Sequence, residues 1–189
     1  MKNTKLNLTA ILFLACSQTA TADLITNGGF ETGNFTGWTV SDDPYDNTTV
    51  EKASSDPNNL VIPFSGEYVA RLGTADMDGT LSQTIVDAAG QPYQLSMWLK
   101  SDGNTPNDFN VSWNGNTIYS QTNIPVSDYF NIALNVTSTG TDTLLIGERN
   151  DAGYLYLDNV SLNSVPLPGT FALLGLSLAG LAYLQRKPV

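Results

Sequence analysis

The chain of 189 residues contains no histidine, and Cys16 is its single cysteine. The missing histidine removes the usual general base for a serine or cysteine nucleophile and the most common zinc ligand. One cysteine cannot form a disulfide within the chain, so a disulfide framework is excluded. The fold must therefore depend on its hydrophobic core, alone or with a bound ion.

Basic residues are also scarce. All eighteen acidic residues lie between positions 23 and 164, where Lys52, Arg71, Lys100 and Arg149 are the only basic ones, which leaves a net formal charge of −14. Such a segment repels nucleic acid, so we expect no nucleic-acid partner. An acidic surface rich in Asn, Thr and Ser suits neutral sugars or divalent cations, and it would equally serve only to keep an exported protein soluble.

The sequence offers little support for catalysis. No glycine-rich phosphate loop joins a strand to a helix, so nucleotide binding has no support. Two carboxylates about 5 or 9 Å apart can cleave a glycosidic bond, but no spacing in the chain singles out such a pair. We therefore predict a non-catalytic protein and keep a carboxylate-pair glycosidase as an alternative.

The first 22 residues have the parts of a secretory signal peptide. Lys2 and Lys5 give a positive start, residues 6–15 are apolar, and Ala20-Thr21-Ala22 forms a cleavage site before Asp23. A lipoprotein signal through Cys16 stays open as an alternative. Either reading predicts export through the inner membrane.

The last 25 residues, 165–189, form a second targeting segment. The turn Val165-Pro166-Leu167-Pro168 precedes an apolar run over 171–184, and Arg186 and Lys187 follow it. An apolar run this short, diluted by glycine, serine and alanine, predicts a minimal and transient transmembrane helix. An ordinary C-terminal anchor or an amphipathic core helix are the alternatives.

This order of parts resembles the PEP-CTERM sorting signal of Gram-negative bacteria that make exopolysaccharide. The resemblance covers Val165 to Lys187, with Leu167 where the family's motif has glutamate. It implies an exosortase-type membrane protease as partner, a membrane location before processing, and a final place in the cell envelope, on the cell surface or in the extracellular matrix. The same region is also called an ice-binding protein C-terminal domain, a label that implies nothing about ice here.

The segment between the two signals, residues 23–164, has the length of one domain and alternates polar and apolar residues with a period of two. Over 93–100 the odd-numbered residues are apolar, and 129–136 repeats the pattern. Asn114-Gly115 predicts a type I′ hairpin turn, and further strands are expected at 80–86, 143–146 and 154–162. About eight such strands predict an all-β fold, an antiparallel jelly-roll β-sandwich.

Three segments of this domain resemble galactose-binding-like carbohydrate-binding modules. They are 27–33 followed by Gly37-Trp38, 65–73, and 156–162. The resemblance implies the sandwich fold, first and last strands side by side, and a structural calcium. Its oxygen donors would be Glu31 and Asp158, with backbone carbonyls near Asn27 and Gly66.

The same two acids have a simpler interpretation, in which Glu31 caps a turn and Asp158 accepts backbone amides. The acidic segments 42–46 and 76–79 are alternative ion sites. Neither of these segments matches the twelve-residue EF-hand loop.

For a sugar site the decisive feature is an aromatic ring with one face in solvent, because a pyranose stacks its C–H face on the ring. Trp98 is the best candidate, since it interrupts the polar face of its strand. Tyr129, Asn131 and Arg149 would complete the site if their strands neighbour that of Trp98. Trp38 and Trp113 are expected in the core.

Three functions therefore remain open. The first is a non-catalytic protein that binds a polysaccharide through a face of the sandwich. The second is a structural or adhesion protein of the matrix with a modified surface, suggested by the Asn-x-Ser/Thr triplets at Asn34, Asn47, Asn110, Asn135 and Asn159. The third is the carboxylate-pair glycosidase.

Overall fold

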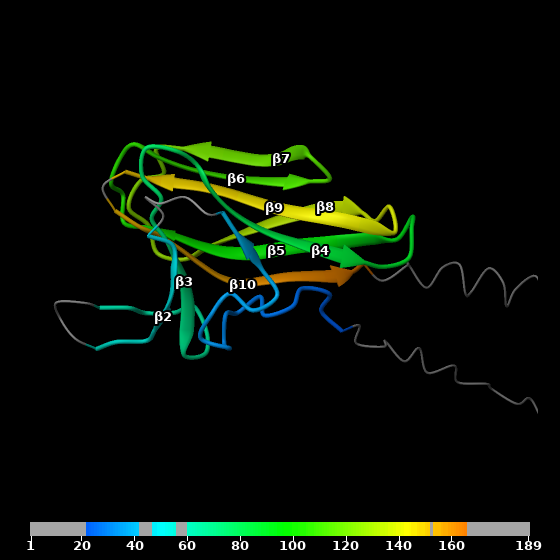
Figure 1. The fold of residues 1–189 in the computed structure, drawn as a ribbon, viewed down its shortest axis with the longest axis horizontal. Coiled ribbons are helices and arrows are strands. Elements are labelled where there is room, and N and C mark those ends of the chain that lie inside the picture. Colours follow the sequence, from blue (N-terminus) through cyan, green and yellow to red (C-terminus); the bar gives the residue numbers. More distant parts are fainter. Residues whose placement is uncertain (1–21, 42–46, 56–59, 152, 166–189) are drawn as a thin grey trace, which may run out of the picture. The chain divides into compact units, whose positions relative to one another are not determined.

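The computed structural model of the chain describes residues 22–41, 47–55, 60–151 and 153–165 (Figure 1). Within those ranges no helix is long and apolar enough to cross a membrane. Most of the expected signal peptide and the expected helix 171–184 lie outside the described residues. Thr21–Val165 forms one compact unit, which contains the whole described core, so it has the parts of an independently folding domain.

In the described part of the chain, ten strands form two antiparallel sheets. Sheet A has the order β1 (Thr39–Val40), β4 (Gly79–Val86), β9 (Thr141–Asn150), β6 (Asn107–Trp113) and β7 (Asn116–Thr122). Sheet B has the order β2 (Thr49–Lys52), β3 (Tyr68–Leu72), β10 (Leu155–Ser164), β5 (Pro92–Ser101) and β8 (Phe130–Thr137). The predicted all-β jelly-roll sandwich is confirmed.

The core lies between the sheets and follows the alternation of the strands. In β5 the side chains of Tyr93, Leu95, Met97 and Leu99 are all buried, as the sequence predicted. Strands β4, β6, β9 and β10 contribute further buried aliphatic and aromatic side chains in the same way. Trp38 and Trp113, 8% and 7% exposed, belong to this core as expected.

The opening segment of the domain runs beside β10. The Leu24 amide donates to the Leu162 carbonyl (3.2 Å), and the Val160 amide donates to the Gly28 carbonyl (2.9 Å). A Cβ at Gly28 would lie 1.8 Å from the Val160 carbonyl oxygen, so only glycine permits this approach. The first and last segments are therefore neighbours, as the resemblance implied, and this brings Glu31 towards β10.

A bulge in β10 sets which side chains leave the core. The register with β5 shifts between Asp158 and Ser161, and Asn159 has a positive φ of 48°. Leu157 and Val160 are both buried in the core, although residues three positions apart in a regular strand face opposite sides. The bulge therefore adds one residue to the outer face. The bulge thus places Asp158 and Asn159 together on the outer face of sheet B.

The β6–β7 hairpin has the expected type I′ geometry, with φ of 51° at Asn114 and 77° at Gly115. Asn114 also ties the turn to β9, because its Nδ2 donates to Asp142 Oδ1 (2.6 Å) and its Oδ1 accepts the Thr143 amide (2.8 Å). Asp142 is 1% exposed and accepts further hydrogen bonds from Ser138 and Thr139. Burial alone would raise the pKa of Asp142, but these hydrogen bonds lower it to about 2.

Replacing this carboxylate should destabilise the domain in a pH-dependent way. Asp142→Asn loses a charged acceptor for several donors, so the free energy of unfolding should fall by about 2 kcal/mol at neutral pH. Because the folded pKa is depressed, the stabilisation is complete above the ordinary pKa of 3.8 and is lost as the pH falls through about 2.

Denaturant unfolding of residues 21–165 between pH 7 and pH 2 measures this difference. Asp128→Asn, at an exposed position, is the control and should behave like the unchanged domain. A gap between the Asp142→Asn variant and the unchanged domain that stays constant down to pH 2 would contradict the role given to the charge.

Candidate functional site

An aromatic cluster lies on the outer face of sheet B and consists of Phe64, Trp98 and Tyr129. The rings of Phe64 and Trp98 are stacked, with centroids 3.9 Å apart and an interplanar angle of 13°. The Tyr129 ring meets Phe64 edge-on at 5.7 Å. Trp98 comes from β5, Tyr129 directly precedes β8, and Phe64 comes from the segment before β3. The cluster thus joins three parts of the chain.

Hydrogen bonds hold the segment that carries Phe64 over the sheet. The Tyr129 hydroxyl donates to the Ile62 carbonyl (3.0 Å), and the Ser65 amide donates to Asp158 Oδ2 (3.0 Å). The Ser65 hydroxyl donates to Asn159 Oδ1 (2.9 Å). Burial raises the pKa of Tyr129, and the Asp158 charge raises it further, so the hydroxyl remains a donor at every physiological pH.

Polar groups surround the aromatic cluster. Asn131 lies directly opposite Trp98 in the β5–β8 pair, and its Nδ2 donates to the Met97 carbonyl (3.2 Å). Lys100 Nζ lies 5.8 Å from the centre of the Tyr129 ring, within the range of a cation–π contact. The structure therefore brings Trp98, Tyr129 and Asn131 together, as the sequence analysis expected.

Arg149 lies away from this group, so the expectation that it would complete a sugar site beside Trp98 is wrong. Arg149 is part of β9, which belongs to sheet A, whereas Trp98 faces outward from sheet B. Its Nε donates to Asp151 Oδ1 (2.9 Å), so the guanidinium forms a local ion pair. The sequence could not assign β9 to a sheet, since alternation gives the faces of a strand but not its neighbours.

A polar pocket of about 340 Å³ borders Trp98 on the outer face of sheet B. Its lining residues come from the opening segment, β5 and the bulge of β10: Asp23, Gly28, Gly29, Ser96, Trp98, Asn159, Val160 and Ser161. The hydroxyls of Ser96 and Ser161 lie 2.9 Å apart across the two strands. An indole ring beside hydroxyl, amide and carboxylate groups offers both an apolar contact and hydrogen bonds to a polyhydroxylated ring.

The structure adds an aromatic neighbour to Trp98 that the sequence analysis did not include. It is half-buried, and Phe64 covers one face of the indole. Sequence reasoning missed Phe64, although a large aromatic directly before Ser65-Gly66 was an available signal. It also missed Asn159 and Ser161, because the bulge that turns them outward has no clear mark in the sequence.

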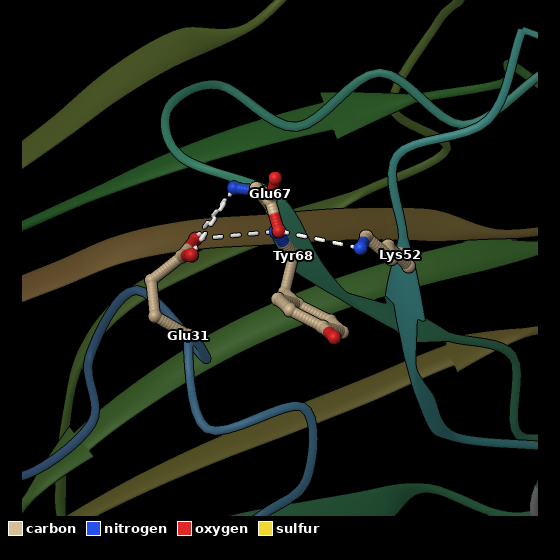
Figure 2. Close-up of polar contacts among 4 residues, drawn as sticks. All are labelled: Glu31, Lys52, Glu67 and Tyr68. Atoms are coloured by element: carbon tan, nitrogen blue, oxygen red, sulfur yellow. Dashed lines mark hydrogen bonds and ion pairs between the residues drawn. The ribbon is translucent and has the colours of Figure 1, made fainter.

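Glu31 binds the start of β3 (Figure 2). Both of its carboxylate oxygens accept the Glu67 amide, at 3.0 and 3.1 Å, and Oε1 also accepts the Tyr68 amide at 3.1 Å. The Glu67 carboxylate lies 3.3 Å from Lys52 Nζ at the end of β2. Gly66 has a φ of 67°, and a Cβ there would lie 2.1 Å from Glu31 Oε1, so this contact needs glycine.

Asp158 is fully buried next to this contact. Burial raises its pKa, amide hydrogen bonds from Ser65, Asn159 and Phe64 lower it, and the charge of Glu31 raises it again. Both predicted metal ligands thus bind backbone amides, as their simpler interpretation proposed. The two charges also lie close enough to repel each other.

The two acids keep the capacity to bind calcium, because each carboxylate has about four acceptor positions and the amides use only part of them. The described residues contain no group of three or more Asp, Glu, His or Cys side chains suited to a metal. A calcium ion would therefore need Glu31, Asp158 and several backbone carbonyls as ligands. Calcium at this pair stays a prediction. Of the alternative ion sites, 42–46 lies outside the described residues.

Solved carbohydrate-binding modules share the fold of this chain. The chain has a TM-score of 0.55 to TmCBM61 in complex with β-1,4-galactotriose, with 23% identity over 77% of this chain and all of that one. For the CBM22-1 xylan-binding domain of Paenibacillus barcinonensis Xyn10C, the TM-score is 0.54, with 15% identity over 80% of this chain and 100% of that one. Identities this low establish the shared fold alone.

A further solved structure with this fold is the K1 cleaved adhesin domain of Lys-gingipain from Porphyromonas gingivalis W83. Its TM-score is 0.57, with 13% identity over 73% of this chain and 96% of that one. No curated protein matches the chain by sequence. Residues 164–187 match the PEP-CTERM protein-sorting motif, so the chain carries this sorting signal, and Pro166, Leu167, Pro168, Arg186 and Lys187 lie in it beyond the described residues.

Calcium should stabilise the domain if Glu31 and Asp158 bind it. We expect calcium to raise the melting temperature of residues 21–165, because a ligand that binds only the folded state stabilises it. A chelator should reverse the rise, and Glu31→Gln should abolish it. Asp78→Asn, in the alternative segment 76–79, is the control. A calcium effect that disappears in Asp78→Asn but survives in Glu31→Gln would show that the ion binds at segment 76–79 instead.

Proposed function

We propose that this chain is an exported, non-catalytic protein of the cell envelope or extracellular matrix that binds a polysaccharide. The carbohydrate-binding surface is the aromatic cluster with the polar pocket beside Trp98. The observation that carries the proposal is this pairing of a fixed indole with hydroxyl, amide and carboxylate groups. The sorting motif supports the export and the location.

The pocket suits one sugar ring held against Trp98. Ser96 and Ser161 donate and accept hydrogen bonds, and Asp23 and Asn159 add acceptors and an amide, so sugar hydroxyls find partners of both kinds. The hydrogen bonds of the segment at 62–65 fix the aromatic cluster before a ligand arrives, which lowers the ordering cost of binding. The acidic surface favours a neutral polysaccharide over an acidic one.

A structural or adhesion role with a modified surface is the second candidate. Its support is the shared fold with the K1 cleaved adhesin domain and the exposure of Asn135 on β8 and of Asn47. Asn34 and Asn159 fit modification less well, because their Oδ1 atoms accept hydrogen bonds within the domain. Both roles are compatible in one matrix protein.

Trp98→Ala should weaken polysaccharide binding strongly while the domain stays folded. Residues 21–165 would be tested for retention on immobilised β-1,4-galactan, xylan and matrix from an exopolysaccharide-producing bacterium. Because the indole supplies the stacking contact with the sugar ring, its loss should weaken binding about tenfold or more. Leu145→Ala, on the outer face of sheet A, is the matched control and should bind normally.

The binding experiment separates the three functions. Equal retention of Trp98→Ala and Leu145→Ala would show that Trp98 does not contact the polysaccharide. No retention on any polysaccharide, together with an added mass on the chain from its natural source, would favour the modified matrix protein. Release of reducing ends from a polysaccharide would establish the glycosidase instead.

The sorting signal should be processed by an exosortase-type membrane protease. We expect the chain recovered from the envelope of a host with such a protease to begin at Asp23 and to lack the apolar run 171–184. Pro168→Ala should leave the full tail in place and keep the chain in the membrane fraction. Intact mass and fractionation measure both, and a tail retained in the unaltered chain would contradict the processing step.

A further inference from the structure

The side of the sandwich formed by the edge strands β7 and β8 has a surface unlike the rest of the domain. A groove of about 400 Å³ lies between the two edges and is lined mainly by apolar groups from β7, the β7–β8 connection and β8: Tyr119, Gln121, Ile124, Pro125, Ser127 and Phe130. Beside it, Val126 is 76% exposed. We call this surface the β7–β8 side.

The β7–β8 side is almost without charge. From Asp108 to Asp142 the only charged residue in between is Asp128, whereas the domain as a whole carries a net charge of −14. Two copies of so acidic a domain repel each other through most surfaces, and this side is where they can approach at the lowest electrostatic cost.

Strand β7 also presents a free backbone edge. It is the last strand of sheet A in the described part of the chain and appears as the outermost strand at the top of Figure 1. Its sequence, Asn116–Thr122, has no lysine, glutamate or proline, the residues that usually protect an edge from pairing. The opposite edges differ, since β1 has two residues and β2 has four, with Glu51 and Lys52 among them.

Apolar side chains follow the same side. Ile118 and Tyr119 on β7, and Phe130 and Leu134 on β8, pack against the core but stay partly exposed. A partner strand placed against β7 would cover apolar side chains on this strand and would also extend the ladder of backbone hydrogen bonds. These two gains are those of strand addition at an open sheet edge.

We propose that a second copy of this chain occupies the β7–β8 side, with the two β7 strands paired antiparallel. The edge is self-complementary, because an antiparallel pair of identical strands has a two-fold axis perpendicular to the sheet. The same axis brings the uncharged surfaces of the two copies together.

This arrangement has a consequence that rests on the proposed function. An axis perpendicular to the sheet leaves the outer faces of both sheets B free and on the same side of the dimer. Two Trp98 pockets then face one polysaccharide surface, so the dimer would bind with an avidity that a single domain lacks. The dimer itself does not depend on sugar binding.

Sedimentation of residues 21–165 over a range of concentrations tests the dimer. The unchanged domain should associate reversibly, and Ser120→Asp should weaken the association at least tenfold, because each copy brings a carboxylate to the shared edge. Thr84→Asp is the matched control, since it adds the same charge at an exposed position of β4, an inner strand of sheet A far from the β7 edge. It should associate like the unchanged domain.

Two further readouts identify the surface. Raising the salt concentration should strengthen the dimer, because salt screens the repulsion of the acidic domains and no ion pair holds this surface. Amide hydrogen exchange of β7 should slow as the protein concentration rises. A monomer at all concentrations overturns the proposal, as does a dimer that Ser120→Asp leaves intact. Sugar retention on Trp98 is measured separately, so either idea can fail alone.

Discussion

The buried carboxylate of Asp158 is the constraint on which the outer face of sheet B depends. A buried charge must be compensated by hydrogen bonds or a counter-ion, and here the compensation comes from amides of the segment before β3 and of the bulge itself. Asp158 lies opposite Trp98 on the outer face, directly before the bulge, and there it accepts the amide of Ser65. One carboxylate thus fixes a long connection against a strand that is about ninety residues away.

The position of Phe64 is a consequence of that contact. Phe64 directly precedes Ser65, which Asp158 holds, and this contact positions the Phe64 ring on the face of Trp98. Glu31 holds the other end of the same segment through the amides of Glu67 and Tyr68, and it reaches them because Gly28 lets the opening segment lie against β10 (Figure 2). The aromatic cluster, the pocket and the acid pair are therefore one coupled arrangement, in which a change at one part is felt by the others.

Two parts of the domain surface differ in character. Sheet B carries the aromatic rings, the polar pocket and Lys100, which are features suited to a glycan. Beside it, the uncharged β7–β8 side offers a free edge and an apolar groove, which are features suited to a protein. Because the two surfaces are separate, a protein contact on one does not block a ligand on the other.

The all-β class, the inward residues of β5, the hairpin at Asn114-Gly115 and the sorting motif could all be predicted from the amino-acid sequence. These depend on local chemistry: the alternation of side chains, the positive φ that Asn and Gly tolerate, and a short apolar tail. It also named Trp98, Tyr129 and Asn131, because an aromatic residue on a polar strand face is a local signal. Three features could be seen only in the folded domain: Phe64 covers Trp98, Arg149 lies on the other sheet, and Glu31 and Asp158 hold one segment. Strand order, bulges and long connections join residues far apart in the chain, and no local pattern encodes those distances.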